Sequence, residues 1–216
     1  MNQHLGEIPL FPLNTVLFPG AQLPLHIFEQ RYRQMISWCI QERSPFGVVL
    51  IKEGEETGGS AVPFEVGTIA RILKVDRIQD GRMNILTVGE RRFRILEKTQ
   101  ITPYLKGNLV DLDDPDQNCR QDLIDLVRVA FRKYVRTLVG LSGNWVREVD
   151  VDPHPVSLSY SVASTLDIDM PEKQRLLQTD NAEERLEYEL LILEKEQTRL
   201  WKNLEKKYRF AGAVLN

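Results

Sequence analysis

Residues 8–32, IPLFPLNTVLFPGAQLPLHIFEQRY, combine a long apolar run with four prolines, Pro9, Pro12, Pro19 and Pro24. A signal peptide needs basic residues before its apolar core, and the first ten residues contain neither lysine nor arginine. A membrane-spanning helix needs about 20 largely apolar residues, and proline at this density interrupts such a helix. The stretch therefore predicts extended structure, with short strands broken by turns and some of them at a sheet edge.

The rest of the first half is rich in strand patterns and contains one helical pattern. Apolar residues recur every three or four positions over 29–43, which predicts a short amphipathic helix. Residues 46–51 and 104–112 read as strands, and 65–96 read as a long hairpin whose turn is Asp80-Gly81. Several strands with one short helix favour a small, partly closed barrel.

The second half changes to helical patterns after the polar stretch 113–118. We expect helices over these ranges: 121–140, from Pro155 to about 166, from Pro171 to 177, and 182–207. The predicted fold class is therefore α+β, with a β-rich domain at 1–113 followed by an α-helical domain at 114–216.

The last predicted helix starts at Asp180, interpreted as its N-cap, with Glu183 at the capping-box position. Its leucines are spaced four and three residues apart: Leu186, Leu190, Leu193, Leu200 and Leu204, with Gln197 interrupting the seam. We interpret the seam as packing on the other helices of this chain. A homo-oligomer formed through this helix is the alternative.

Composition excludes some classes of protein. The chain has 216 residues, 42% of them hydrophobic, and a net charge of −3, with neither half strongly basic. An affinity built on phosphate contacts is therefore disfavoured, and nucleic acid is an unlikely partner. Two distant cysteines, Cys39 and Cys119, provide neither a disulfide framework nor a zinc site and suit a reducing compartment. We expect a cytoplasmic protein without a membrane span.

Signatures of catalysis are also missing. The Gly-rich stretch 54–60 lacks the Gly-Lys-Ser/Thr ending of a phosphate-binding loop, and no Gly-x-Ser-x-Gly occurs. His26 and Glu29 form a His-x-x-Glu pair, but a metal site would need a third ligand from a distant segment. We expect no catalytic residue, no cofactor and no metal.

Two features are compatible with binding. Residues 89–95 interleave three arginines with Phe93, as in proteins that stack on nucleic acid bases. Strand alternation explains the pattern more simply, with Arg92 and Arg94 on a solvated face and Phe93 on a core face. The second feature is an excess of large apolar residues, some of which could line a groove for polypeptide. The candidate binding residues are Phe11, Phe18, His26, Phe28 and Phe93.

The opening stretch, together with residues 65–96 and 172–196, resembles the substrate-binding domain at the N-terminus of ATP-dependent Lon proteases. The shared features include the strand EVGTIA, the Asp-Gly turn, the strand GERRF and the closing helices. The resemblance covers about residues 7–206. It implies a PUA-like β pseudo-barrel followed by a helical lobe, and a role in engaging unfolded or tagged substrates.

Full-length Lon proteases continue into an ATPase and a Ser–Lys peptidase. This sequence contains no Walker A motif and stops at Asn216. From the resemblance we therefore expect a stand-alone, non-catalytic protein that binds unfolded or apolar polypeptide segments or a partner protein, in protein quality control. The alternatives are a PUA-like RNA-binding protein, a structural scaffold and a small-molecule-binding module.

Overall fold

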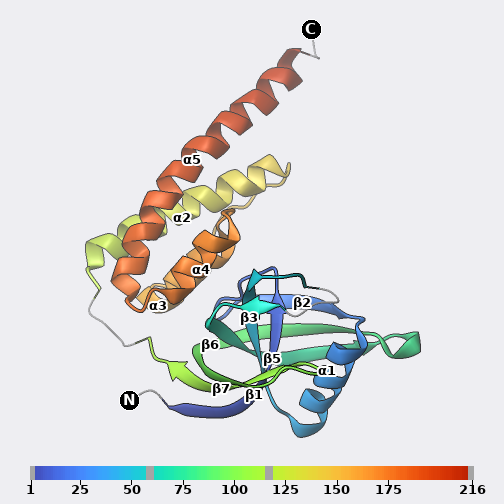
Figure 1. Ribbon diagram of the computed structural model, residues 1–216. Helices are drawn as coiled ribbons and strands as arrows, with labels where there is room; N and C mark the ends of the chain where they lie inside the picture. Colours follow the sequence, from blue (N-terminus) through green and yellow to red (C-terminus); the bar gives the residue numbers. More distant parts are fainter. Residues whose placement is uncertain (1–2, 57–60, 115–118, 214–216) are drawn as a thin grey trace. The chain divides into compact units, whose positions relative to one another are not determined.

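The computed structural model describes residues 3–56, 61–114 and 119–213 (Figure 1). The chain forms two compact units. The strand unit contains Met1–Asp114 and Ala163–Asp180, and the helical unit contains Pro115–Val162 and Asn181–Asn216. The predicted α+β fold class is confirmed. The predicted division into two domains at 113/114 stays a prediction, although the contacts of 163–180 group that segment with the strands.

The strand unit is built on a closed ring of strands. Antiparallel pairs join β1 to β7, β7 to β6, β6 to β5 and β5 to β3, and a parallel pair between β3 and β1 closes the ring. The strands are β1 (His4–Leu13), β3 (Phe46–Glu53), β5 (Val66–Arg77), β6 (Met83–Gln100) and β7 (Leu105–Leu112), and the short β4 (Val62–Pro63) pairs with β3. Closure removes most free strand edges.

Strand β1 corrects the expectation of short, broken strands, because it runs without interruption through Pro9 and Pro12. Up to Leu10 it pairs with β7, and from Leu10 onward it pairs with β3. Pro9 therefore pairs only with β7 and Pro12 only with β3, so each has a paired strand on one side and none on the other. A missing N–H can face the unpaired side at little cost, which explains how two prolines fit within one strand.

Beyond the ring, β5 and β6 continue as a long hairpin. At its tip Asp80 and Gly81 both have positive φ, 76° and 81°, as the predicted Asp-Gly turn requires. The tip is the short helix η1 (Gln79–Gly81). Strand β2 (Gln22–Ile27) adds to the other side of β6, from Ile27 opposite Met83 to Gln22 opposite Val88. We call β2, residues 83–88 of β6 and residues 71–77 of β5 the arm.

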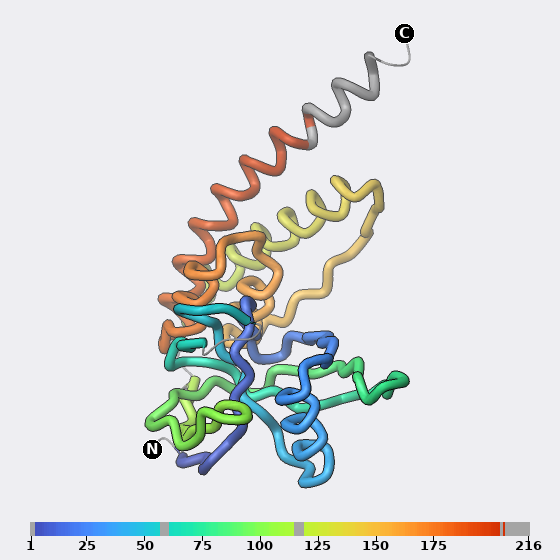
Figure 2. Tube along the Cα trace, turned by 45° about the vertical axis from the view of Figure 1, so that its right-hand side comes forward, coloured from blue at the N-terminus to red at the C-terminus, as the bar shows by residue number. Residues whose placement is uncertain are grey.

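Helix α1 (Gln30–Glu42) covers one face of the arm, and both views show the hairpin projecting beside it (Figures 1 and 2). Its buried side chains Tyr32, Met35, Ile36 and Cys39 join one apolar cluster with residues of the arm, including Met83 and Ile85. A second cluster fills the ring: Ile8, Leu10, Val49, Ile69, Phe93, Ile95 and Leu109. The predicted helix at 29–43 is confirmed.

Helix α4 (Met170–Gln178) belongs to the strand unit. Asp169 caps it by accepting a hydrogen bond from the backbone N–H of Glu172 at 2.9 Å. The buried Gln174 side chain donates to the backbone oxygen of Val66 on β5, also at 2.9 Å. These contacts, with the buried Leu176 and Leu177, explain why this helix groups with the strands.

The helical unit contains α2 (Gln121–Leu141), residues 155–162 of α3 (Pro155–Thr165), and α5 (Ala182–Ala213). Helices α2 and α5 lie side by side. Leu186, Leu193 and Leu200 of the predicted seam are buried within the chain, whereas the side chain of Leu204 lies outside the described residues. Gln197 fits the seam by donating to the Thr137 hydroxyl at 2.9 Å. Oligomerisation through α5 stays a prediction.

The predicted N-cap of the last helix is wrong by one residue. The Asn181 side-chain oxygen accepts from the backbone N–H groups of Glu183, at 2.8 Å, and Glu184, at 3.2 Å. Asp180 instead forms an ion pair with Arg92 at 3.2 Å. Within the described residues, none of the helices combines the length and apolar character that a membrane span requires.

Glu189 on α5 leads to a prediction about pH. It is fully buried, and neither carboxyl oxygen accepts a hydrogen bond from a described residue, although Arg185 lies one turn earlier. Burial raises the pKa of Glu189 well above its usual value, and the charge of Arg185 only partly opposes this. The folded state therefore holds the proton more tightly than the unfolded chain. The proton on Glu189 therefore contributes to the stability of the folded state. This contribution is complete below the unfolded pKa and is lost as the pH rises toward the folded pKa.

The variant Glu189→Gln removes this titration. We compare the free energies of unfolding of the variant and the parent chain at each pH. The difference in favour of the variant should be larger at pH 8 than at pH 5 by about 1 kcal/mol or more, since one pKa unit corresponds to about 1.4 kcal/mol. Urea unfolding at both pH values measures the difference. An advantage that is independent of pH would contradict a raised pKa.

Candidate functional site

The face of the arm opposite α1 is open to solvent and carries two of the candidate binding residues. His26 on β2 lies opposite Asn84 on β6, which in turn lies opposite Asp76 on β5. All three side chains are exposed, and His26 Nδ1 donates to Asn84 Oδ1 at 2.7 Å. Phe28 is 51% exposed, and its ring centroid lies 6.0 Å from that of His26. An exposed aromatic pair of this kind can contact a ligand directly.

The other three candidates are buried in this structure. Phe11 stacks on Tyr32 with ring centroids 4.0 Å apart, in the cluster between α1 and the arm. Phe18 is 1% exposed, and Phe93 lies in the cluster that fills the ring. The structure therefore brings together only His26 and Phe28 at the surface. Alternation alone could place Phe93, but burial of Phe11 and Phe18 depends on contacts distant in sequence.

His26 and Glu29 both have other partners. His26 hydrogen-bonds to Asn84, and Glu29 accepts from Arg31 Nε at 3.0 Å. The described ranges contain no group of three His, Cys, Asp or Glu residues placed to hold a metal ion. Cys39 is buried, and burial raises the pKa of its thiol to about 12, so it is a poor nucleophile. Residues 57–60 of the Gly-rich stretch lie outside the described residues.

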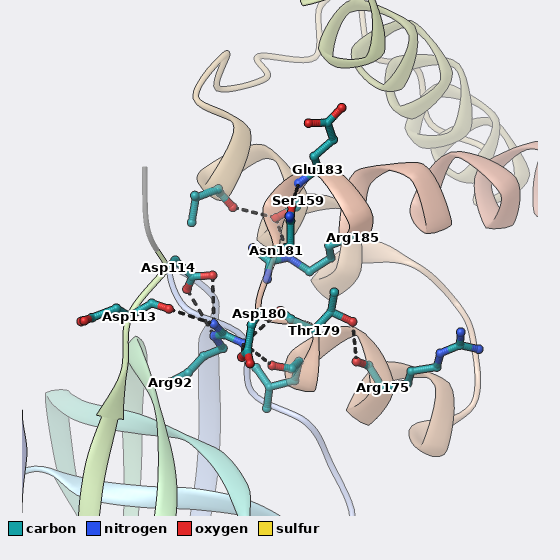
Figure 3. A network of polar contacts seen from close by, with 12 residues as sticks. Arg92, Asp113, Asp114, Ser159, Arg175, Thr179, Asp180, Asn181, Glu183 and Arg185 are labelled. Atoms are coloured by element: carbon teal, nitrogen blue, oxygen red, sulfur yellow. Dashed lines mark hydrogen bonds and ion pairs between the residues drawn. The ribbon is translucent and has the colours of Figure 1, made fainter. Parts of the chain in front are cut away.

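Residues 89–95 depart from the expected alternation at one position. Arg94 is exposed and Phe93 and Ile95 are buried, as predicted, but Arg92 is completely buried. The reason is that residues 113–114 and 177–180 cover this point of β6 with hydrogen-bond acceptors (Figure 3). In this structure Phe93 cannot stack on a base and Arg92 cannot reach a phosphate. The pattern that suggested nucleic acid therefore forms no such surface.

The Arg92 guanidinium contacts both segments at which the chain leaves the strand unit. Its Nη1 donates to the backbone oxygens of Leu177, at 2.9 Å, and Thr179, at 3.0 Å, and also to Asp180 Oδ1. Its Nη2 lies 3.1 Å from Asp114 Oδ1. Since Asp114 and Asp180 are the last residues of the two parts of this unit, one side chain fixes both ends. Sequence reasoning missed this role.

A groove of about 380 Å³ lies between the C-terminal end of α1 and residues 71–75 of β5. Its lining includes the apolar side chains of Ile40, Ile72, Leu73 and Val75. Leu73 is 43% exposed, and Arg43, Arg71, Lys74 and Glu90 supply the charged part of the lining. The exposed arm and the adjoining groove are thus two accessible surfaces of the strand unit.

Comparisons with known proteins identify the family. The family model described as "ATP-dependent protease La (LON) substrate-binding domain" matches residues 7–195. The chain therefore belongs to the Lon substrate-binding domain family, which confirms the resemblance seen in the sequence.

Two longer relatives are Lon proteases. The chain is 30% identical over 192 residues to the Lon protease of Anaeromyxobacter dehalogenans (strain 2CP-C), a match that covers 86% of this chain and 23% of that protein. It is 29% identical over 192 residues to Lon protease 2 of Myxococcus xanthus, with the same coverage. The chain thus spans about a quarter of the length of these relatives, and the match lies in their substrate-binding domain.

Two solved structures have the same fold. The Lon N-terminal domain protein from Xanthomonas campestris is 30% identical, with a TM-score of 0.68 and coverage of 87% of this chain and 98% of that one. The N-terminal domain of the Mycobacterium avium complex Lon protease is 20% identical, with a TM-score of 0.61 and the same coverage. At that identity the second likeness shows the fold alone.

Proposed function

We propose that this chain binds polypeptide segments that are unfolded or rich in apolar residues, without catalysing a reaction on them. The match of residues 7–195 to a substrate-binding domain carries the proposal. The relatives are named as proteases, enzymes that act on proteins, and this supports polypeptide as the ligand class. A role in protein quality control, alone or with a separate protease, is part of the same proposal.

Contact with the client is assigned to the open face of the arm. His26 and Phe28 supply aromatic surface there, and aromatic side chains bury a large area at small cost in conformational entropy. Phe11, Phe18 and Phe93 are buried in the strand unit and do not reach this surface. Substituting any of these three would disturb the fold, so they do not serve as tests of binding.

The experiment compares a client in two states. We expect the chain to bind a reduced, carboxymethylated protein that cannot fold, and to ignore the native form of the same protein, as measured by fluorescence anisotropy. Phe28→Asp should weaken binding by about fivefold or more, in the range of an interface anchor.

The matched control is Leu96→Asp, because Leu96 on β6 is 53% exposed, close to the 51% of Phe28. Leu96→Asp should leave the affinity unchanged. Equal binding of the native and unfolded forms, or no binding of either, would overturn the proposed function. Equal losses in the two variants would remove the assignment to His26 and Phe28 while leaving the function.

A further inference from the structure

Two strand edges of the arm lie outside the closed ring. Residues 22–27 of β2 pair with β6 on one side, and no second partner strand for them is found within the described ranges. Residues 71–77 of β5 also pair only with β6, because the pairing with β3 ends at Ala70, opposite Phe46. Each edge presents backbone N–H and C=O groups to which another extended chain can bond.

The β2 edge is the poorer template. Pro24 lies in its middle, opposite Leu86, and proline has no N–H to donate. Proline fits an edge strand where its nitrogen faces away from the paired strand, so the missing donor is one that an added strand would need. A strand binding there would meet a gap in the ladder. Prolines of this kind protect edges against pairing.

The β5 edge contains no proline between Arg71 and Arg77, and the apolar groove lies beside it. The groove runs between this edge and the end of α1, where Ile40 and Arg43 line the far wall. An extended peptide placed along a strand and beside a helix can bond its backbone to the edge and set alternate side chains into the groove. Leu73, Ile72 and Val75 provide the apolar contact on the β5 side.

The charges around the groove select among such peptides. The lining contains three cations, Arg43, Arg71 and Lys74, against one carboxylate, Glu90. Arg71 is paired with Glu90, and Lys74 with Asp76 at 2.8 Å. Arg43 therefore supplies the excess positive charge at the end of α1. A client with a carboxylate at this end of the groove complements it.

We propose that an extended apolar client segment carrying an acidic residue adds as a strand to the free edge of β5, with its apolar side chains in the groove and its carboxylate at Arg43. This inference rests on the proposed function and adds a second contact for the client, at the edge of the arm on the other side of β6 from His26. Backbone bonding makes recognition tolerant of sequence, and the groove restricts it to segments that are extended and apolar.

A bulge makes the same edge a poor template for pairing between two copies of the protein. The register of β5 against β6 shifts between Ile72 and Lys74, which leaves Leu73 without a partner in the ladder. Bulges and charged residues interrupt long edge-to-edge pairing between copies of a protein. A short peptide that also fills the groove gains contacts that compensate for the interrupted ladder.

The test uses short fluorescent peptides of alternating valine and threonine with a glutamate at one end. Strand addition uses every second N–H of the peptide, so N-methylation of one alternate set should weaken binding by about tenfold or more, and methylation of the other set should have little effect. Equal effects of the two methylation patterns would overturn strand addition. Replacing the glutamate with lysine should also weaken binding.

Protein variants locate the site. Leu73→Asp should weaken binding of the peptide by about tenfold, whereas Ile101→Asp, at a 69% exposed residue of the same unit, should not. Arg43→Asn should abolish the preference for glutamate over lysine, since asparagine tolerates the left-handed φ of 51° found at Arg43. If the parent chain binds no unfolded polypeptide, the proposed function fails. If it binds but Leu73→Asp and Ile101→Asp behave alike, only this inference fails.

Discussion

Arg92→Met is expected to lower the free energy of unfolding of the strand unit by about 3 kcal/mol, because several hydrogen bonds from one buried guanidinium are lost together. The side chain is completely buried, and its loss removes the shared donor of Leu177, Thr179, Asp114 and Asp180. Methionine fills part of the volume but donates no hydrogen bond. The buried Leu177 carbonyl would lose its donor and pay its desolvation cost, whereas the exposed Asp180 carboxylate can bond to water instead.

The matched control is Arg94→Met, two residues further along the same strand and exposed. Its effect should stay within about 0.5 kcal/mol, as for most surface substitutions. Arg92→Lys keeps the charge but loses the planar fork, so its stability should lie between the two. Urea unfolding gives the energies. Backbone hydrogen exchange should accelerate at 112–114 and 177–181 in Arg92→Lys. An equal acceleration throughout the chain would contradict a role of Arg92 that is limited to these two segments.

Local patterns predicted most of the elements of this fold. The helix at 29–43 and the hairpin at 65–96 were accessible because apolar periodicity and the Asp80-Gly81 turn depend on neighbouring residues alone. The continuity of β1 could not be predicted in this way, since it depends on the change of its pairing strand from β7 to β3 at Leu10. The closed ring also requires the parallel pair between β1 and β3, which no local pattern indicates.

The candidate site shows the same limit. Strand alternation placed Phe93 and Arg94 correctly, but it could not reveal that residues 113–114 and 177–180 cover Arg92. The groove was equally inaccessible, because it joins the end of α1 to residues 71–75, about 30 positions later in the chain. Exposed apolar residues can be counted in a sequence. Which of them share a surface is decided by pairings between distant segments.

Gly67→Ala should destabilise the strand unit by about 3 kcal/mol, at the upper end of the range for overpacked cores. Gly67 on β5 lies opposite Phe93 on β6, whose ring occupies the space that a side chain at Gly67 would need. A Cβ there would lie 2.6 Å from Val49 Cγ1 and 2.8 Å from Phe93 Cζ, and even closer to the backbone oxygen of Val48. A backbone oxygen in a paired strand cannot move aside as a side chain can.

Gly140→Ala is the matched control, because no atom lies within 4 Å of a Cβ built at Gly140 on α2. Alanine is favoured over glycine within helices by about 1 kcal/mol, so this variant should be neutral or more stable. Urea unfolding of both variants measures the contrast. A Gly67→Ala variant as stable as Gly140→Ala would mean that the backbone at Val48 moves aside as well as the ring of Phe93. Made in the Phe93→Leu background, Gly67→Ala should cost less than in the parent chain but still destabilise, because the contacts with Val48 and Val49 remain.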